Sequence, residues 1–301
     1  MDEVTDLLDR IQQRLPGLRP SEQSIARFVL SDPERALRMS ITNLADHVEV
    51  SVATVARFCS GVDASGYGDF RRQLTAALTR NTAELSRFGV SDTDVSPTDD
   101  IGEVITKIAL HEVHAIQATA NSLDVTAIDA VVDAVIAAPR IDIYGSAASA
   151  VAGVDLQQKL HRLALASFHW SDPHLALASA AILQEGCVAI GISHSGLTIE
   201  TAHAIAVARD AGATTVAITN YPDSPLARAA DHVLCTVARE TRYRSGAMSG
   251  RMAQLAIVDF LFVRAAQRRH DQVPGSLEER YHLIQAHRLN YHDDVSSPSR
   301  S

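Results

Sequence analysis

The sequence predicts two domains: an all-helical N-terminal domain, followed by an α/β domain built on a five-stranded parallel sheet with helices on both faces. Three observations lead to this fold class. Apolar residues recur at three- and four-residue spacings through the first 80 positions. A polar stretch, FGVSDTDVSPTDD, then occupies residues 88–100, and from residue 140 short apolar runs alternate with helical patterns. A chain of 301 residues, 46% of them hydrophobic, is long enough for two such domains.

The N-terminal helices follow from apolar periodicity and from prolines. Pro16 and Pro20 separate the first two helices, and Ser21 before Glu22 predicts the start of the second. Residues 31–33, Ser-Asp-Pro, end that helix, and two further helices are expected near residues 36 and 40. The apolar positions that carry the pattern are Val4, Leu7, Leu8, Ile11, Ile25, Phe28 and Val29.

The second half alternates strand and helix. A helix is expected from Ile101 to about Leu123 before this alternation begins. The candidate strands are 141–144, 167–169, 187–192, 214–219 and 232–236, and the helical patterns are 149–164, 173–184, 199–211, 225–230 and 249–267. Such alternation indicates a parallel sheet covered on both faces. Ligands of these sheets bind beyond the carboxyl ends of the strands.

Four segments result from this division of the chain. They are a helical domain at 1–80, a linker with a connecting helix at 81–127, an α/β domain at 128–267, and a C-terminal helix with a polar tail at 268–301.

Charge and composition exclude some classes of protein. The net charge is −9, and residues 1–80 hold 10 Arg against 11 Asp plus Glu, so a uniformly basic nucleic-acid-binding fold is excluded. No apolar run approaches the roughly 20 residues of a membrane span, and the start MDEVTDLLDR is too acidic for a signal peptide. We therefore expect a cytoplasmic protein without membrane contact. Cys59, Cys187 and Cys235 lack paired spacing and are predicted to be buried thiols.

Residues 41–59 have the spacing of a helix-turn-helix motif. Leu44, Ala45 and Val48 face inward from one helix, a turn follows at Glu49, and Ser51 caps a second helix that packs through Val55 and Phe58. Glu49 occupies the turn position that usually holds glycine. An α-hairpin in another kind of helical domain is the alternative. The residues predicted to contact DNA from the second helix are Ser51, Val52, Ala53, Thr54 and Arg57.

A longer segment resembles the N-terminal domain of the RpiR family of transcriptional regulators. The segment runs from Leu18 to Cys59 and continues into SGYGDFRRQL. Its landmarks are the break at Asp32-Pro33-Glu34, Met39-Ser40, Ser51 to Cys59, and Gly66-Tyr67 with Phe70. The chain departs from the family at residues 60–64, where a basic pair is usual, and Arg71 and Arg72 are the expected substitutes for phosphate contacts. A solvated helix face is the alternative for both arginines.

Two loops after predicted strands combine glycine with hydroxyl side chains. The first runs from Gly145 through Ser146 to Ser149, and the second has the sequence ISHSGLTIE at residues 192–200. Hydroxyls and free helix N–H groups together surround a phosphate without a compensating charge. A purely structural role as helix caps is the alternative. The second loop contributes Ser193, His194, Ser195, Gly196 and Thr198.

Together the two loops resemble the SIS (sugar isomerase) domain. Its loops read G-x-G-x-S and S-x-S-G-x-T, which correspond here to Gly145 with Ser149 and to Ser193 through Thr198. Ala147 replaces the second glycine, and Leu197 stands where a Glu is common. The resemblance implies a phosphosugar site, and it places Glu240 at that site's border.

Isomerisation of a phosphosugar requires a general base, and no clear one emerges. Glu200 lies in the first turn of a predicted helix, where a carboxylate complements the helix dipole, so a structural role explains it. His194 and Glu240 are equally consistent with ligand binding and with a place on the protein surface. His111-Glu-Val-His114 lacks the HExxH spacing of a zinc site. We therefore predict no catalytic residues, no metal and no cofactor.

The combination predicts a transcriptional regulator, a homodimer or homotetramer, that binds operator DNA and responds to a phosphorylated sugar. A phosphosugar isomerase or lyase with an accessory helical domain is the alternative, and an SIS-mediated assembly module is a third.

Overall fold

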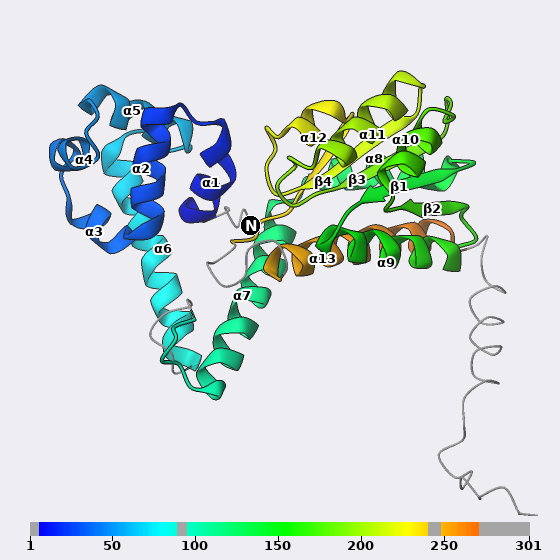
Figure 1. Cartoon of the computed structure of the whole chain (residues 1–301). Coiled ribbons are helices and arrows are strands. Elements are labelled where there is room, and N and C mark those ends of the chain that lie inside the picture. The colour runs from blue at the N-terminus through cyan, green and yellow to red at the C-terminus, as the bar shows by residue number, and fades with distance from the viewer. Residues whose placement is uncertain (1–5, 89–94, 240–247, 271–301) are drawn as a thin grey trace, which may run out of the picture.

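The computed structural model describes residues 6–88, 95–239 and 248–270. Figure 1 shows a helical domain and an α/β domain joined through two long helices, α6 and α7, which form a V. The C-terminal helix and tail predicted for residues 268–301 lie almost wholly outside the described residues. None of the described helices has the length and hydrophobicity required to cross a membrane.

The helical domain packs six α-helices around one core. Ile25, Val29, Leu44, Phe58 and Phe70 are among its buried side chains. Side-chain caps fix several helix starts: Asp6, Asp32, Ser40 and Ser51 each accept a backbone N–H of the first turn. The helices are α1 (Leu7–Arg14), α2 (Pro20–Ser31), α3 (Pro33–Arg38), α4 (Ile41–His47), α5 (Val52–Gly61) and α6 (Tyr67–Phe88), with a 3₁₀ turn at Leu15–Gly17.

The predicted start of the second helix at Ser21 is wrong, because α2 begins at Pro20. Proline suits the first helical position, where its missing N–H would have no partner. The Glu22 carboxylate then accepts the backbone N–H of Arg19 at 3.2 Å, which closes the first turn.

The turn between α4 and α5 has the geometry that the sequence predicted. Glu49 adopts a φ of 55°, which glycine would adopt without strain. The cost to a non-glycine residue is about 1 kcal/mol. Because the Val50 N–H donates to the Ala45 carbonyl at 2.9 Å, the turn stays closed in spite of that cost.

Helices α6 and α7 connect the two domains, and helix α8 follows α7 and leads to the sheet. Helix α7 (Ile101–Ser122) is capped by Asp100, whose carboxylate accepts the Glu103 N–H at 2.9 Å and whose own N–H donates to the Glu103 carboxylate at 3.0 Å. Helix α6 continues eight residues past the expected boundary at residue 80. Helix α8 (Val125–Ala137) was not predicted; Asp124 caps it through the Thr126 N–H.

The sheet has five parallel strands, as expected, and their order is β2-β1-β3-β4-β5. The order reverses between β1 and β3, which pair from Ile141 opposite Val188 to Gly145 opposite Ile192. In open parallel sheets ligands generally bind beyond the carboxyl ends of the strands at such a switch point. The strands are β1 (Ile141–Gly145), β2 (Ser167–Trp170), β3 (Val188–Ile192), β4 (Thr214–Thr219) and β5 (His232–Cys235).

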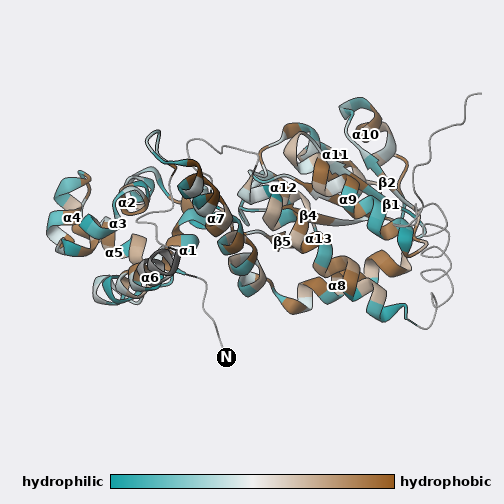
Figure 2. Ribbon diagram, turned by 90° about the horizontal axis from the view of Figure 1, so that it is seen from below, coloured by the Kyte–Doolittle hydropathy of each residue, from teal (hydrophilic) through white to brown (hydrophobic). Residues whose placement is uncertain are grey.

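Helices cover both faces of the sheet. On one face, α8, α9 and α13 pack against a β-branched core that includes Ile143, Ile190 and Val216. On the other face, α10, α11 and α12 pack through alanine-rich surfaces against Tyr144, Ala189 and Ala217. Figure 2 shows that α8 is largely hydrophobic, as a helix lying on a core must be. The remaining bounds are α9 (Ala148–Arg162), α10 (Pro173–Ala180), α11 (Ile199–Asp210), α12 (Pro225–Ala229) and α13 (Ser249–Arg268).

The three cysteines are free thiols. Cys59 and Cys187 are buried as predicted, whereas Cys235 is half-buried. Burial raises the pKa of the Cys59 and Cys235 thiols to about 11, so both stay protonated and unreactive at neutral pH.

Candidate functional site

Helices α4 and α5 form a packed pair with one outward helix face. Leu44 and Ala45 of α4 are buried against the same core as Val55 and Phe58 of α5. The Ser51 hydroxyl accepts the Thr54 N–H at 3.1 Å and starts α5. The N-terminal half of α5 is thereby held at the surface of the domain.

The outward face of α5 includes three of the residues predicted to contact DNA, Val52, Ala53 and Arg57. Val52 is 42% exposed and the Arg57 side chain 54% exposed, and Ala53 is exposed as well. The expectation that Thr54 also faces outward is wrong, because Thr54 is only 6% exposed and its hydroxyl bonds to that of Ser51 at 2.9 Å. Thr54 instead receives a hydrogen bond from Arg57 at 3.2 Å and so positions that guanidinium.

Two further contacts orient the basic residues predicted to meet DNA. Arg57 lies 3.7 Å from the carboxylate of Glu22 on α2, whose side chain is only 11% exposed. Arg71 lies on α6, where its Nε donates to the Leu37 carbonyl at 3.1 Å. This bond ties α6 to the end of α3 and leaves the rest of the exposed guanidinium facing solvent.

The first hydroxyl loop follows β1. A Cβ at Gly145 would lie 3.2 Å from the Ser149 carbonyl oxygen, so only glycine lets the loop turn this closely. Ala147 adopts a φ of 51°, the conformation that glycine supplies elsewhere in such loops. The loop therefore keeps the close approach despite the alanine, at the cost of local strain. Ser146 is half-buried, whereas Ser149 is buried with its hydroxyl accepting from Gln254 at 3.1 Å.

The second hydroxyl loop follows β3 and is closed by its own hydroxyls. Ser193 bonds to the Thr198 hydroxyl at 2.9 Å and accepts the Gly196 N–H at 3.1 Å. Ser195 accepts the Leu197 N–H at 3.2 Å. Gly196 has a φ of 63°, which makes the turn that brings these groups together. The structure thus places all the predicted hydroxyls of this loop in one short turn.

The helices after these loops begin without side-chain caps. Neither Ala147 before α9 nor Thr198 before α11 makes a capping hydrogen bond, although most other described helices have one. In α9 the N–H groups of Ser149 and Ala150 donate to the Ser146 and Ala147 carbonyls at 3.1 Å, so it is the positive end of each helix dipole that favours an anion. Because β1 and β3 are adjacent, the two helix starts lie at the same edge of the sheet.

Sequence reasoning missed three buried polar residues at this edge. Ser249, on the first turn of α13, is 2% exposed, and its hydroxyl has no hydrogen-bond partner among the described residues. The Nδ2 group of buried Asn220, just after β4, is likewise without a partner there. The Gln254 side chain of α13 donates a hydrogen bond to the Ser149 hydroxyl of α9 at 3.1 Å. Orphaned buried donors are usually satisfied by a ligand or by water.

Acid–base candidates are few at this edge. His194 is half-buried with its ring 5.9 Å from that of Tyr221 in an edge-to-face arrangement, and Glu200 is exposed on the first turn of α11. Glu240 lies outside the described residues. Across the described ranges, no group of three or more His, Cys, Asp or Glu residues is arranged to hold a metal.

Two family models match the chain, one for each domain. The model described as "Helix-turn-helix domain, rpiR family" covers residues 5–81, and the SIS domain model covers residues 135–264. An uncharacterized HTH-type transcriptional regulator of Caldanaerobacter subterraneus is 35% identical over 95% of this chain and 100% of its own length. The chain belongs to the rpiR family of HTH-type transcriptional regulators.

Solved structures extend the likeness of this rpiR-family regulator to both domains. The Vibrio vulnificus NanR protein complexed with ManNAc-6P is 27% identical, with a TM-score of 0.59 over 94% of this chain and 100% of that one. The sugar isomerase domain of an RpiR transcription factor from Sphaerobacter thermophilus is 25% identical, with a TM-score of 0.55 over 60% of this chain and 99% of that one. Both resemble the regulator in fold, and the first does so along nearly its whole length.

Proposed function

We propose that this regulator binds a phosphorylated sugar at the carboxyl edge of its sheet, and that occupancy changes the affinity of the α5 face for operator DNA. The observation that carries the proposal is the convergence of two uncapped helix starts with the hydroxyls of Ser193, Ser195 and Thr198. The similar NanR protein was solved with a sugar phosphate, which supports the same ligand class here.

Some groups of the site suit the phosphate of such a ligand, and others suit its sugar. Neutral hydroxyls and helix N–H groups suit the phosphate dianion, since each donates without bringing a charge. The orphaned groups of Ser249 and Asn220 are suited to sugar hydroxyls, which accept as readily as they donate. We assign Gly145, Ser146, Ser149, His194 and Gly196 to the same site, because they belong to the two loops.

A thermal-shift screen tests the ligand. ManNAc-6P, glucose 6-phosphate and fructose 6-phosphate are expected to raise the Tm of the full chain, because a ligand that binds only the folded state stabilises it. The corresponding unphosphorylated sugars are the control and should leave the Tm unchanged. Ser195→Ala should reduce the shift while retaining DNA binding. A panel without any shift would overturn the sugar-phosphate assignment.

We further propose that the site holds its ligand without converting it. Leu197 is exposed at the position where related loops often carry a Glu, and the loop hydroxyls bond to one another and to backbone N–H groups. Turnover of a sugar phosphate by the wild-type chain, in a ketose–aldose assay, would favour the isomerase alternative.

DNA contact through α5 is the second part of the proposal. We assign Ser51, Val52, Ala53 and Arg57 to the groove-facing surface, with Thr54 supporting Arg57 and with Arg71 nearby in sequence on α6. A helix of this kind reads half a site, and a homodimer or homotetramer supplies the second copy.

Arg57→Ala is expected to weaken binding to a duplex selected from random DNA by the wild-type chain. The loss should be about fivefold to 100-fold, and the salt slope should fall by about one counterion if Arg57 contacts phosphate. Fluorescence anisotropy in a salt titration measures both. Arg38→Ala removes a comparably exposed arginine paired with Glu34 on α3 and serves as the matched control. Equal affinity of Arg57→Ala and wild type would exclude α5 as the reading helix.

A further inference from the structure

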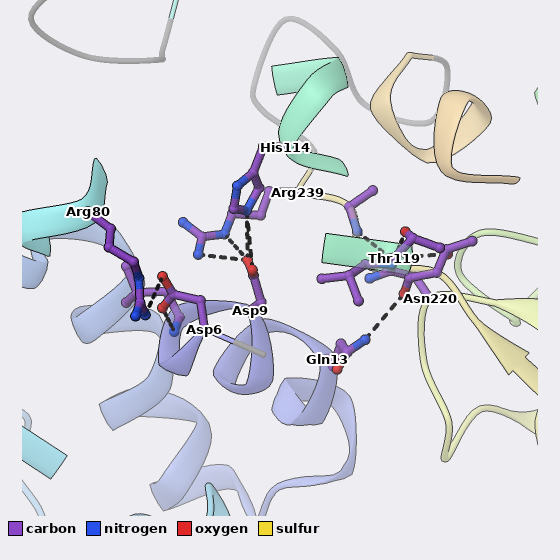
Figure 3. A network of polar contacts seen from close by, with 12 residues as sticks. Asp6, Asp9, Gln13, Arg80, His114, Thr119, Asn220 and Arg239 are labelled. Carbon is purple, nitrogen blue, oxygen red and sulfur yellow. Dashed lines mark hydrogen bonds and ion pairs between the residues drawn. The ribbon is translucent and has the colours of Figure 1, made fainter. Parts of the chain in front are cut away.

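Helix α1 of the helical domain lies against the loops at the carboxyl edge of the α/β domain. Gln13 donates to the Thr236 carbonyl at 3.3 Å, and Gln12 lies 3.5 Å from the Tyr221 hydroxyl. Figure 3 shows Gln13 and Asp9 directed from α1 toward this edge. The contact joins residues more than 200 positions apart in the sequence.

Asp9 is the centre of this contact. Its side chain is 1% exposed, although it lies on a surface helix of its own domain. Both Nε and an Nη of Arg239, just beyond β5, lie 2.8 Å from its Oδ1, and His114 of α7 lies 3.2 Å from its Oδ2 (Figure 3). The carboxylate is therefore buried by, and paired with, elements outside the helical domain.

The charged groups at this contact stabilise one another in their ionised forms, as the pKa shifts of Asp9 and His114 indicate. Burial alone raises the pKa of Asp9, but Arg239 and His114 outweigh it and hold that pKa below the usual range. The hydrogen bond that His114 donates to the Asp9 carboxylate in turn raises the pKa of His114. Asp6, at the start of α1, adds a weaker effect that also raises the pKa of His114. Separating the domains would leave Asp9 without these partners, or expose all three groups to water.

A short chain of hydrogen bonds leads from the second hydroxyl loop to Arg239. The His194 carbonyl, between Ser193 and Ser195, accepts the Asn220 N–H at 3.0 Å and the Thr219 hydroxyl at 3.2 Å. The Asn220 side-chain oxygen accepts the Ala238 N–H at 2.8 Å. Ala238 directly precedes Arg239, so a shift of the loop is transmitted to the base of the Arg239 side chain.

We propose that Asp9, Arg239 and His114 form an interdomain latch that couples the hydroxyl loop to the position of the helical domain. The inference rests on the proposed function, because it assigns the route by which a sugar phosphate at the loop alters DNA affinity. The ligand acts by changing the relative free energies of latched and unlatched states, and this requires that it bind the two states unequally.

The test compares how strongly a sugar phosphate changes DNA affinity in the wild-type chain and in three variants of the full chain. The coupling is the ratio of DNA dissociation constants with and without each sugar phosphate of the thermal-shift panel. Wild type is expected to show a ratio of at least about fivefold in either direction. Asp9→Asn and Arg239→Gln, which break the latch from opposite sides, should bring the ratio below about twofold while sugar-phosphate affinity stays within about threefold of wild type. Arg264→Gln breaks an Arg–Asp pair of 2.7 Å inside the α/β domain and should keep the wild-type ratio.

A measurement without ligand keeps the inference falsifiable if one variant folds poorly. Hydrogen exchange of the α1 amides should accelerate in both latch variants and not in Arg264→Gln, because α1 loses its docking contact. Wild-type coupling and wild-type α1 exchange in both latch variants would overturn the latch. If no sugar phosphate changed the Tm or the DNA affinity of the wild-type chain, the proposed function would be overturned instead.

Discussion

Asp142→Ala is expected to lower the free energy of unfolding by about 3–5 kcal/mol, the range for removing one partner from a buried charged network. Asp142 lies in β1 with a fully buried side chain. Arg140 donates to it at 2.8 and 3.1 Å, Trp170 at 3.0 Å and Tyr144 at 3.2 Å, and Ser179 of α10 donates as well. One carboxylate thus satisfies donors from β1, β2 and α10.

The size of the effect comes from the donors that would be left behind. Burial, together with the negative charge of Asp142, raises the pKa of Tyr144, so that its hydroxyl stays protonated and needs an acceptor. Alanine supplies none, and each unsatisfied buried donor costs about 1–3 kcal/mol. The small cavity left by the missing carboxylate adds to the loss.

Chemical denaturation followed by circular dichroism measures this loss. Asp133→Ala is the matched control, because it removes an exposed carboxylate paired with Arg268 and should change stability by no more than about 1 kcal/mol. Equal midpoints for the two variants would show that the Asp142 network contributes no more than a surface ion pair.

The strands could be predicted to within about one residue because most of them are short, largely apolar or β-branched runs bounded by polar residues or glycine. Helix α8 could not be separated in the same way. Its apolar pattern begins two residues after α7 ends, and the only signal between them is the Asp124 cap at the end of Asn-Ser-Leu-Asp. A cap of this kind is recognised more easily once the sheet shows that a helix is needed there.

The candidate site was predictable where it is local in sequence. The hydroxyl loops are contiguous, so Gly196 and its neighbours follow from the strand that precedes them. Thr54 was misplaced because three consecutive helical positions cannot all face outward, and the capping bond to Ser51 turns this one inward. Ser249 depends on how α13 returns to the sheet edge, and the pairing of Asp9 with Arg239 spans 230 positions. Neither relation has a sequence signal without an alignment or a structure.

Gly196→Ala is expected to reduce sugar-phosphate affinity by at least about tenfold, which corresponds to a loss of about 1.4 kcal/mol or more of binding free energy. A Cβ at this position would overlap the Ser224 side chain and lie 2.9 Å from the Thr219 hydroxyl. The Gly196 carbonyl also accepts the Leu226 N–H of α12 at 3.1 Å, so the residue cannot move away without breaking that bond. The loop would have to shift as a unit and would carry Ser193 and Ser195 with it.

The control for this substitution is another glycine with the same backbone requirement. Gly186 has a φ of 85°, but a Cβ there would meet nothing closer than 3.9 Å, from Pro139. Gly186→Ala therefore carries the cost of an alanine at positive φ, about 1 kcal/mol, without a clash. Calorimetry should find near wild-type affinity in Gly186→Ala and little binding in Gly196→Ala. Equal affinities in the two variants would mean that the ligand does not depend on the geometry of the 193–198 turn, and the phosphate would then have to be held elsewhere along the sheet edge.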